Sequence, residues 1–147
     1  MVDVGGKDKT DREAIAAAVV YLNADTFTLV RDGRLKKGDV LAVAQVAAVM
    51  AAKRTSDIIP MCHHILLTGC DINFDLDEKS STITIKATVR CNGETGVEME
   101  SLTAVTVAAL TIYDMCKAAQ RDIVIGEIKL LRKAGGKSGE YERSALS

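Results

Sequence analysis

SLTAVTVAALTIYDMCKAAQ, residues 101–120, is the stretch of this sequence that decides the fold. Its Ala, Leu and Met residues favour a helix, and its apolar residues lie on every side of the projected cylinder, which indicates a buried helix. Asp114 and Lys117 are the only charged residues in the run, and a spacing of three places them side by side on one helical face. A helix of this kind needs a sheet or another subunit to cover it.

Two acidic residues, Glu98 and Glu100, stand just before this run. Their spacing of two places both carboxylates on the same side of the backbone if the segment is extended. Four ionisable groups then converge on one apolar segment, where burying an unpaired charge is costly. Two interpretations remain open on these residues alone, a structural ion pair beside a solvated strand and an active site with tuned carboxylates and a tuned lysine.

The composition excludes several classes of protein. The chain has 147 residues, 48% hydrophobic and 27% charged, which is enough for one soluble domain with a real core. A net charge of −1 with no Trp, three Tyr and two Phe argues against nucleic-acid and membrane partners. The four cysteines have no Cys-x-x-Cys spacing, and we see neither an export signal nor an apolar run of membrane-spanning length. We therefore expect a cytoplasmic protein with reduced thiols.

Further elements follow from periodicity and turn signals. Asp39 is a plausible N-cap for a second, nearly all-apolar helix that ends near Lys53 and Arg54. Alternation over residues 69–91 predicts an antiparallel hairpin, and residues 123–131 predict another strand. We expect a single domain over 1–147, with a flexible arm at about 1–9 and a flexible tail at about 134–147.

The segment 12–22 is ambiguous. A capping box at residues 10–13 and an Ala-rich run favour a helix, whereas the alternation of Ile15, Val19 and Tyr21 with smaller residues favours a strand. If the segment is a strand, the element order is βαββαβ. That order is typical of the ferredoxin-like α+β fold, an antiparallel sheet packed on two long helices.

Three short motifs carry candidate chemistry. Met61-Cys62-His63-His64 could contribute to a zinc site, but the chain has no second Cys/His pair, so a packed or substrate-contacting histidine is the better interpretation. Gly136-Lys137-Ser138 lacks the upstream Gly and the following helix of a P-loop, although a Gly-Lys tail can still fold over phosphates. The basic pairs Lys36-Lys37 and Lys53-Arg54 are either solvated helix ends or a polyphosphate site.

Seven motifs occur together and in order over nearly the whole chain, and they resemble the MoaC family, the cyclic pyranopterin monophosphate synthases of molybdenum cofactor biosynthesis. The motifs are Met1-Val2-Asp3-Val4, Lys37-Gly38-Asp39-Val40, Ala52-Lys53-Arg54-Thr55, Ile59-Pro60-Met61-Cys62-His63, Thr95-Gly96-Val97-Glu98-Met99-Glu100, Leu110-Thr111-Ile112-Tyr113-Asp114-Met115-Cys116-Lys117 and Gly135-Gly136-Lys137-Ser138-Gly139. The fifth and sixth strings, at this separation, are the most specific.

The resemblance implies an enzyme, a lyase of ferredoxin-like fold that assembles as a homohexamer, a trimer of dimers with active sites at a subunit interface. It implies conversion of 3′,8-cyclo-7,8-dihydroguanosine 5′-triphosphate to cyclic pyranopterin monophosphate and pyrophosphate. The resemblance implies no tightly bound cofactor and no metal held by the protein. It leaves open whether Mg²⁺ binds together with the substrate triphosphate.

The resemblance also assigns residues. Asp114, Lys117 and Lys37 match catalytic positions. The matching substrate-binding positions are Met61, Cys62, His63, Glu98, Met99 and Glu100, and the basic residues Lys53, Arg54 and Lys137 are expected to bind the phosphates. One position departs from the family, since His64 stands where a Pro is usual, and Pro would fix φ and remove a backbone donor.

Two other function classes remain as alternatives. One is a metal-dependent hydrolase that uses His63, His64, Glu98 and Glu100, and the other is a non-catalytic nucleotide-binding module. Metal content after chelation would test the first, and nucleotide binding without turnover would favour the second.

Overall fold

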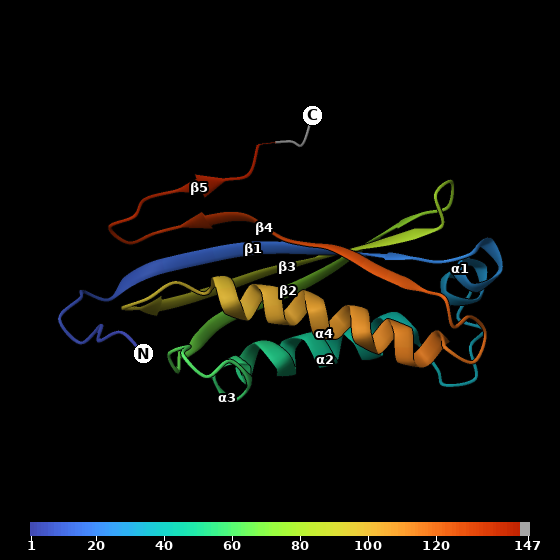
Figure 1. The fold of residues 1–147 in the computed structure, drawn as a ribbon, viewed down its shortest axis with the longest axis horizontal. Helices are drawn as coiled ribbons and strands as arrows, with labels where there is room; N and C mark the ends of the chain where they lie inside the picture. The colour runs from blue at the N-terminus through green and yellow to red at the C-terminus, as the bar shows by residue number, and fades with distance from the viewer. Residues whose placement is uncertain (145–147) are drawn as a thin grey trace.

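The computed structural model describes residues 1–144 and shows a five-stranded sheet with two long helices on one of its faces (Figure 1). The elements in chain order are β1 (Thr10–Tyr21), α1 (Ala24–Arg31), α2 (Val40–Lys53), α3 (Thr55–Ile58), β2 (Leu67–Asp77), β3 (Thr82–Gly93), α4 (Glu98–Cys116), β4 (Val124–Ala134) and β5 (Tyr141–Glu142). The strand order is β2-β3-β1-β4-β5, and neighbouring strands are antiparallel. This arrangement confirms the predicted ferredoxin-like α+β fold.

β1 contains residues 12–21 of the ambiguous segment, so the helical alternative is wrong. β1 is hydrogen-bonded to β3 on one side and to β4 on the other, which satisfies its backbone groups along both edges. Ala16, Ala18 and Val20 are fully buried on its inner face. This pairing on both sides outweighs the helix propensity of the Ala-rich run, because propensity is a weak local preference.

The two predicted long helices exist, and they pack against each other as well as against the sheet. Small residues permit this close approach, since Ala44 and Ala48 of α2 and Ala104 and Ala108 of α4 are fully buried. The side chain of Asp39 accepts a hydrogen bond from the Ala42 amide at 3.1 Å, which confirms the predicted N-cap of α2.

The predicted bounds of the last helix were wrong at both ends. It begins at Glu98, so the two acidic residues lie in its first turn, and it ends at Cys116. The amide of Lys117 still bonds to the carbonyl of Tyr113, and a turn follows. The acidic pair is therefore helical, not extended.

Three elements were not predicted: the helix α1, the single-turn helix α3 and the short strand β5. α1 is capped by Asn23, whose side chain accepts a hydrogen bond from the Thr26 amide at 2.8 Å. The segment predicted as a flexible tail, residues 134–147, begins with the last residue of β4 and contains β5. Residues 145–147 of that segment lie outside the described residues. Residues 1–9 contain no helix and no strand. They form one turn, which is closed by a hydrogen bond from the Lys7 amide to the Val4 carbonyl.

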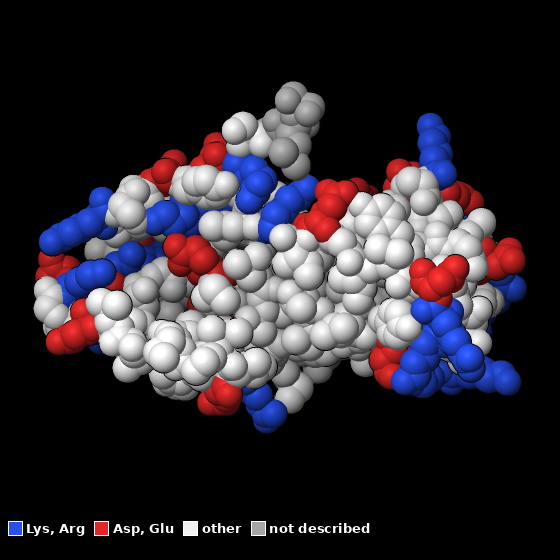
Figure 2. All heavy atoms as spheres, viewed as in Figure 1, with Lys and Arg blue, Asp and Glu red and all other residues white. Residues whose placement is uncertain are grey.

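One face of the molecule has a large uncharged area at its centre. Figure 2 shows this area surrounded by charged side chains, with Lys and Arg at both ends and along the upper edge. Val43, Val46 and Met50 on α2 and Leu110 on α4 are exposed, with Val46 at 60% and Leu110 at 54%. Within residues 1–144, no helix is both long and apolar enough to cross a membrane.

Candidate active site

The carboxylate of Asp114 is held between two lysines at the C-terminal end of α4. Its Oδ1 accepts from Lys117 Nζ at 2.6 Å, and its Oδ2 accepts from Lys37 Nζ at 2.9 Å. Lys37 Nζ also donates to the Asp114 carbonyl at 3.0 Å. Lys117 is placed by helical spacing, and Lys37 by the turn before α2, where Gly38 adopts a φ of +106° that favours glycine.

The electrostatics of this triad follow from the two contacts. Hydrogen bonds from Lys117 and then Lys37 lower the pKa of Asp114 to about 2, and the carboxylate in turn raises the pKa of Lys117. All three side chains stay about half exposed, at 55% for Asp114, 53% for Lys117 and 47% for Lys37. At neutral pH the group is therefore an ionised carboxylate that holds two ammonium groups open to solvent.

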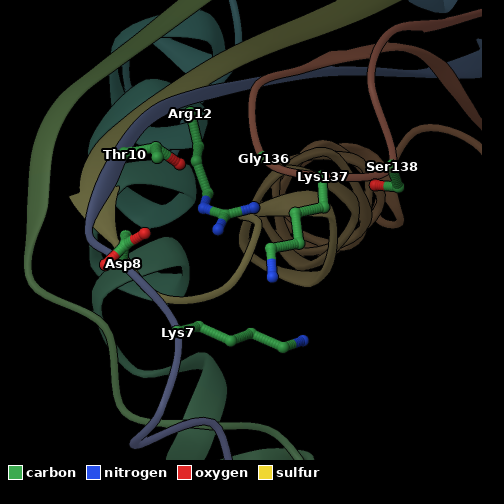
Figure 3. Close-up of a pocket in the computed structure, with 7 residues that line it drawn as sticks. All are labelled: Lys7, Asp8, Thr10, Arg12, Gly136, Lys137 and Ser138. Atoms are coloured by element: carbon green, nitrogen blue, oxygen red, sulfur yellow. The ribbon is translucent and has the colours of Figure 1, made fainter.

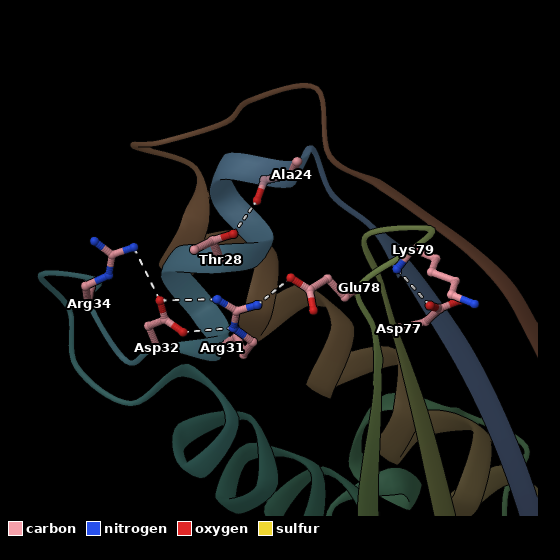
Figure 4. A network of polar contacts seen from close by, with 8 residues as sticks. All are labelled: Ala24, Thr28, Arg31, Asp32, Arg34, Asp77, Glu78 and Lys79. Carbon is pink, nitrogen blue, oxygen red and sulfur yellow. Dashed lines mark hydrogen bonds and ion pairs between the residues drawn. The ribbon is translucent and has the colours of Figure 1, made fainter.

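A second carboxylate at the same end of the molecule, Asp32, is also held between two cations. Asp32 accepts from Arg31 at 2.8 Å and from Arg34 at 3.4 Å, while Arg31 also contacts Glu78 at 2.7 Å (Figure 4). This network joins α1 to the β2–β3 turn across the surface. A carboxylate between two cations is therefore not by itself evidence of a catalytic site. Asp32 provides a matched control for Asp114.

The opposite end of α4 holds the acidic pair. Two residues on a helix are separated by about 200°, so Glu98 and Glu100 point to different sides, and the expectation of a shared side was wrong. Glu100 is only 2% exposed, and its Oε1 lies 3.8 Å from Cys62 Sγ. Its Oε2 has no hydrogen-bond partner among the described residues, and burial raises its pKa.

The loop between α3 and β2 lies against this end of α4. A cavity of about 300 Å³ is lined there by Met61, Cys62, His63, Thr95, Glu98 and Met99, among others. His63 Nε2 lies 2.6 Å from the Val2 carbonyl oxygen, and His64 Nδ1 lies 3.0 Å from Ser56 Oγ. Residues 1–144 of one chain contain no cluster of three or more His, Cys, Asp or Glu side chains that could hold a metal ion.

A basic cavity of about 430 Å³ adjoins the start of β1 (Figure 3). Arg12, Lys7 and Lys137 line it together with Asp8, Thr10, Gly136 and Ser138. The Arg12 guanidinium is fixed by bonds to the carbonyls of Gly93 at 2.9 Å and Glu94 at 3.0 Å. Gly136 adopts a φ of +77°, which favours glycine, and a Cβ there would collide with the Arg12 guanidinium unless that side chain moved.

Lys137 was predicted from the sequence, but Lys7, Thr10 and Arg12 were missed. Arg12 gives no distinctive local signal, because it lies between Asp11 and Glu13 at the charged start of β1. Lys53 and Arg54 are exposed at the end of α2, on the same end of the molecule as Glu100, and neither forms an ion pair among the described residues.

Within one chain the predicted site residues divide into two groups. Fourteen residues separate Glu100 from Asp114, which corresponds to about 21 Å along the helix axis. Asp114, Lys117 and Lys37 lie at one end of α4. The substrate-binding candidates lie at the other end.

A family model, described as the MoaC family, matches residues 1–136. The chain belongs to the MoaC family. Three relatives, each named cyclic pyranopterin monophosphate synthase, match over nearly their whole length. The relative from Thermoanaerobacter sp. (strain X514) is 64% identical over 143 residues, 97% of this chain and 90% of the relative. The relative from Peptoclostridium acidaminophilum is 60% identical over 146 residues, with coverages of 99% and 92%. The relative from Heliobacterium modesticaldum (strain ATCC 51547 / Ice1) is 59% identical over 143 residues, with coverages of 97% and 90%.

The seven motifs of this MoaC chain cluster at the two ends of its long helices. Those at residues 37–40 and 110–117 meet through Lys37 and Asp114. Those at residues 59–63 and 95–100 meet through Cys62 and Glu100. The family resemblance predicted from the sequence is confirmed by the family model and by the relatives.

Proposed function

We propose that this chain catalyses the conversion of 3′,8-cyclo-7,8-dihydroguanosine 5′-triphosphate to cyclic pyranopterin monophosphate, with release of pyrophosphate, in molybdenum cofactor biosynthesis. The observation that carries the proposal is the Asp114 carboxylate clamped between Lys37 and Lys117 in a chain that belongs to the MoaC family. The relatives named for this product cover nearly the whole chain.

The triad supplies proton donors and positive charge. With the pKa of Asp114 at about 2, the carboxylate is ionised and is a weak base at neutral pH. The protons of the group therefore reside on Lys37 and Lys117, which can donate them to ring nitrogen or to a leaving oxygen. Asp114 holds both ammonium groups within reach of the same reacting atoms, and it stabilises their charge.

The opposite end supplies recognition. Arg12, Lys7 and Lys137 line one cavity and suit a polyphosphate. Lys53 and Arg54 are exposed at the end of α2, outside that cavity, and are proposed to add positive charge at the same end of the molecule. The carboxyl groups of Glu98 and Glu100 and the loop at residues 61–63 suit the amino and imino donors of the guanine-derived ring. Any Mg²⁺ is proposed to enter with the substrate triphosphate, bound to its phosphate oxygens.

Reacting atoms must approach a catalytic group to about 3–3.5 Å, which the separation of about 21 Å between the two ends of α4 does not allow in one chain. We therefore propose that each site combines the lysine end of one chain with the recognition end of another, in a homohexamer built as a trimer of dimers. The exposed apolar residues Val43, Val46, Met50 and Leu110 support such an interface. A cytoplasmic location is part of the proposal, supported by four free cysteines.

Turnover of the cyclised dihydro-GTP, followed by pyrophosphate release and by detection of the pterin product, tests the proposed function. The expected result is stoichiometric formation of both products by the oligomeric chain. Binding of the triphosphate without turnover by a correctly folded oligomer would overturn the proposal and leave a nucleotide-binding module.

A further inference from the structure

The N-terminal arm, residues 1–9, crosses the loop that carries His63. Asp3 Oδ1 accepts from the Gly5 amide at 2.8 Å, and the Val4 carbonyl accepts from the Lys7 amide at 3.0 Å, so the arm has a defined turn. Met1 and Val4 line a cavity of about 330 Å³ opposite His63 and Thr95. The arm therefore forms a wall of the recognition end.

The hydrogen bond between the arm and His63 is short, and its donor can be identified. His63 Nε2 lies 2.6 Å from the Val2 carbonyl oxygen. A carbonyl oxygen can only accept, so Nε2 must carry the hydrogen. A neutral imidazole has one N–H, which leaves Nδ1 with a free lone pair. Among residues 1–144, no group donates to Nδ1.

This lone pair lies on a residue that belongs to two cavities. His63 lines both the cavity under the arm and the neighbouring cavity with Cys62 and Glu98. A histidine whose tautomer is fixed can accept a hydrogen bond or a proton from the ring of a bound substrate without first rearranging. The two histidines of the chain differ here, because His64 bonds to Ser56, a hydroxyl that can donate or accept.

We propose that the N-terminal arm is a positioning element, which uses the Val2 carbonyl to hold His63 as the Nε2–H tautomer and so keeps Nδ1 as the acceptor for the substrate. This gives a physical role to the Met1-Val2-Asp3-Val4 motif, which the triad and the phosphate cavity do not use. The consequence for catalysis rests on the proposed function, whereas the tautomer itself does not.

Nitrogen NMR of the ¹⁵N-histidine-labelled chain tests the tautomer directly. We measure long-range ¹H–¹⁵N correlations at about pH 8, above the ordinary histidine pKa of about 6.5. Only two imidazoles are present, and His64→Gln assigns them. The expected result is a protonated Nε2 and an unprotonated Nδ1 for His63 in the full chain. Deleting residues 1–3 should turn the His63 signal into a mixture of tautomers and leave the His64 signal unchanged. Ser56→Ala should change the His64 signal and leave the His63 signal unchanged. An Nδ1–H form in the full chain, or an Nε2–H form that survives the deletion, would overturn the proposal.

Kinetics then separate positioning from general folding. We expect the deletion to lower kcat by about tenfold, a part of the roughly 10²–10⁴-fold that a placed acid or base supplies. In a His63→Ala background the same deletion should change kcat by less than about twofold, because residues that act as a unit are non-additive. Equal losses in both backgrounds would show that the arm acts elsewhere. An inactive full chain would refute the proposed function and leave the NMR result standing.

Discussion

Lys117 Nζ lies 2.6 Å from Asp114 Oδ1 at the C-terminal end of α4, and this contact is the largest cause of the lowered pKa of Asp114. The same carboxylate binds Lys37, which comes from a turn 77 residues away in the chain. One local and one distant cation thus share one acceptor. Because the lowered pKa keeps the acceptor ionised, the triad resembles a charged clamp more than a resting acid/base pair.

Asp114→Asn is expected to lower single-turnover rates by about 10²–10⁴-fold or more, the range of a general acid/base contribution. Asn keeps the shape but releases the two ammonium groups from a shared anion. Lys117→Ala should cost about as much, and the double variant should be little worse than either single one, because the residues act as a unit. Rapid-quench measurements on the cyclised substrate give the three rates.

Asp32→Asn is the matched control for this change. It also removes an exposed carboxylate between two cations at the same end of the molecule (Figure 4). We expect a near-normal rate and little change in the thermal midpoint, because exposed surface ion pairs contribute little to stability. Equal losses at Asp32 and Asp114, or losses at Asp114 and Lys117 that simply multiply, would make the triad structural.

The contribution of Asp114 to stability should depend on pH in one direction. Its pKa is lowered in the folded chain, from 3.8 to about 2, mainly by Lys117 and Lys37. The folded state therefore binds this proton more weakly than the unfolded state, so the contribution is complete above about pH 4 and is lost as pH falls through about 2. The thermal midpoints of the unsubstituted chain and of Asp114→Asn should converge over that window. A gap that widens on acidification would contradict the assigned ion pairs.

Some elements of the fold could be predicted from residues close together in the sequence, whereas others depend on contacts between distant parts of the chain. Asp39 as an N-cap and the hairpin at residues 69–91 were predicted correctly, because their signals lie within a few residues. The segment 12–22 could not be settled locally, since what makes it a strand is pairing with β3 and β4, which lie far away in the chain. The start of α4 was missed because Val97 gives no side-chain capping signal.

The site shows the same division. The Asp114–Lys117 contact follows from spacing alone, whereas the approach of Lys37 came only from the resemblance. The basic cavity joins the N-terminal arm to a turn after β4, so no window of sequence contains both Arg12 and Lys137. The prediction that Glu98 and Glu100 share one side failed because it assumed an extended segment. Residues two apart point to the same side of a strand but to different sides of a helix.

Glu100→Gln should stabilise the fold at neutral pH while it impairs turnover. Burial raises the pKa of Glu100 above the ordinary 4.5, so the folded chain is most favoured below that pH and loses stability as pH rises through the raised pKa. Gln removes this loss without changing the shape. Thermal midpoints should match near pH 4 and favour the variant at pH 7.

Glu127→Gln provides a control of opposite sign. Hydrogen bonds from Lys129 and then Tyr21 lower the pKa of Glu127, so its contribution is present above about pH 4.5 and is lost on acidification. That variant should be the less stable one at pH 7. A Glu100→Gln chain that is also less stable at pH 7 would show that the buried carboxylate has a favourable partner.

His64→Pro should be tolerated and should stabilise the chain by up to about 1 kcal/mol, because Pro restricts the unfolded state where its φ fits. His64 is exposed, and within residues 1–144 its backbone amide donates no hydrogen bond. The variant loses only the contact with Ser56, which Ser56→Ala removes separately. Denaturant unfolding of both variants measures the change. A loss of several kcal/mol would mean that the loop conformation here is incompatible with Pro.

Mixing two impaired chains should restore activity if each site draws on two subunits. Co-expressed Asp114→Asn and His63→Ala chains carry defects at opposite ends of α4. In a symmetric pair, a mixed dimer then contains one site with both ends intact, so random pairing should give about a quarter of the normal number of active sites. Two defects at the same end, Asp114→Asn with Lys117→Ala, should give no recovery, because every lysine end is then damaged.

The interface itself can be removed as a further control on this prediction. Val46 is 60% exposed in the isolated chain, so Val46→Asp should leave the monomer fold intact while it places a charge in the proposed apolar contact. Sedimentation at micromolar concentration should show the unsubstituted chain far above 15.7 kDa and the variant at smaller size, with recovery by mixing abolished. A monomer that retains full activity would show that one chain brings both ends of α4 to the substrate, and a fully active oligomer of Val46→Asp would move the interface away from α2.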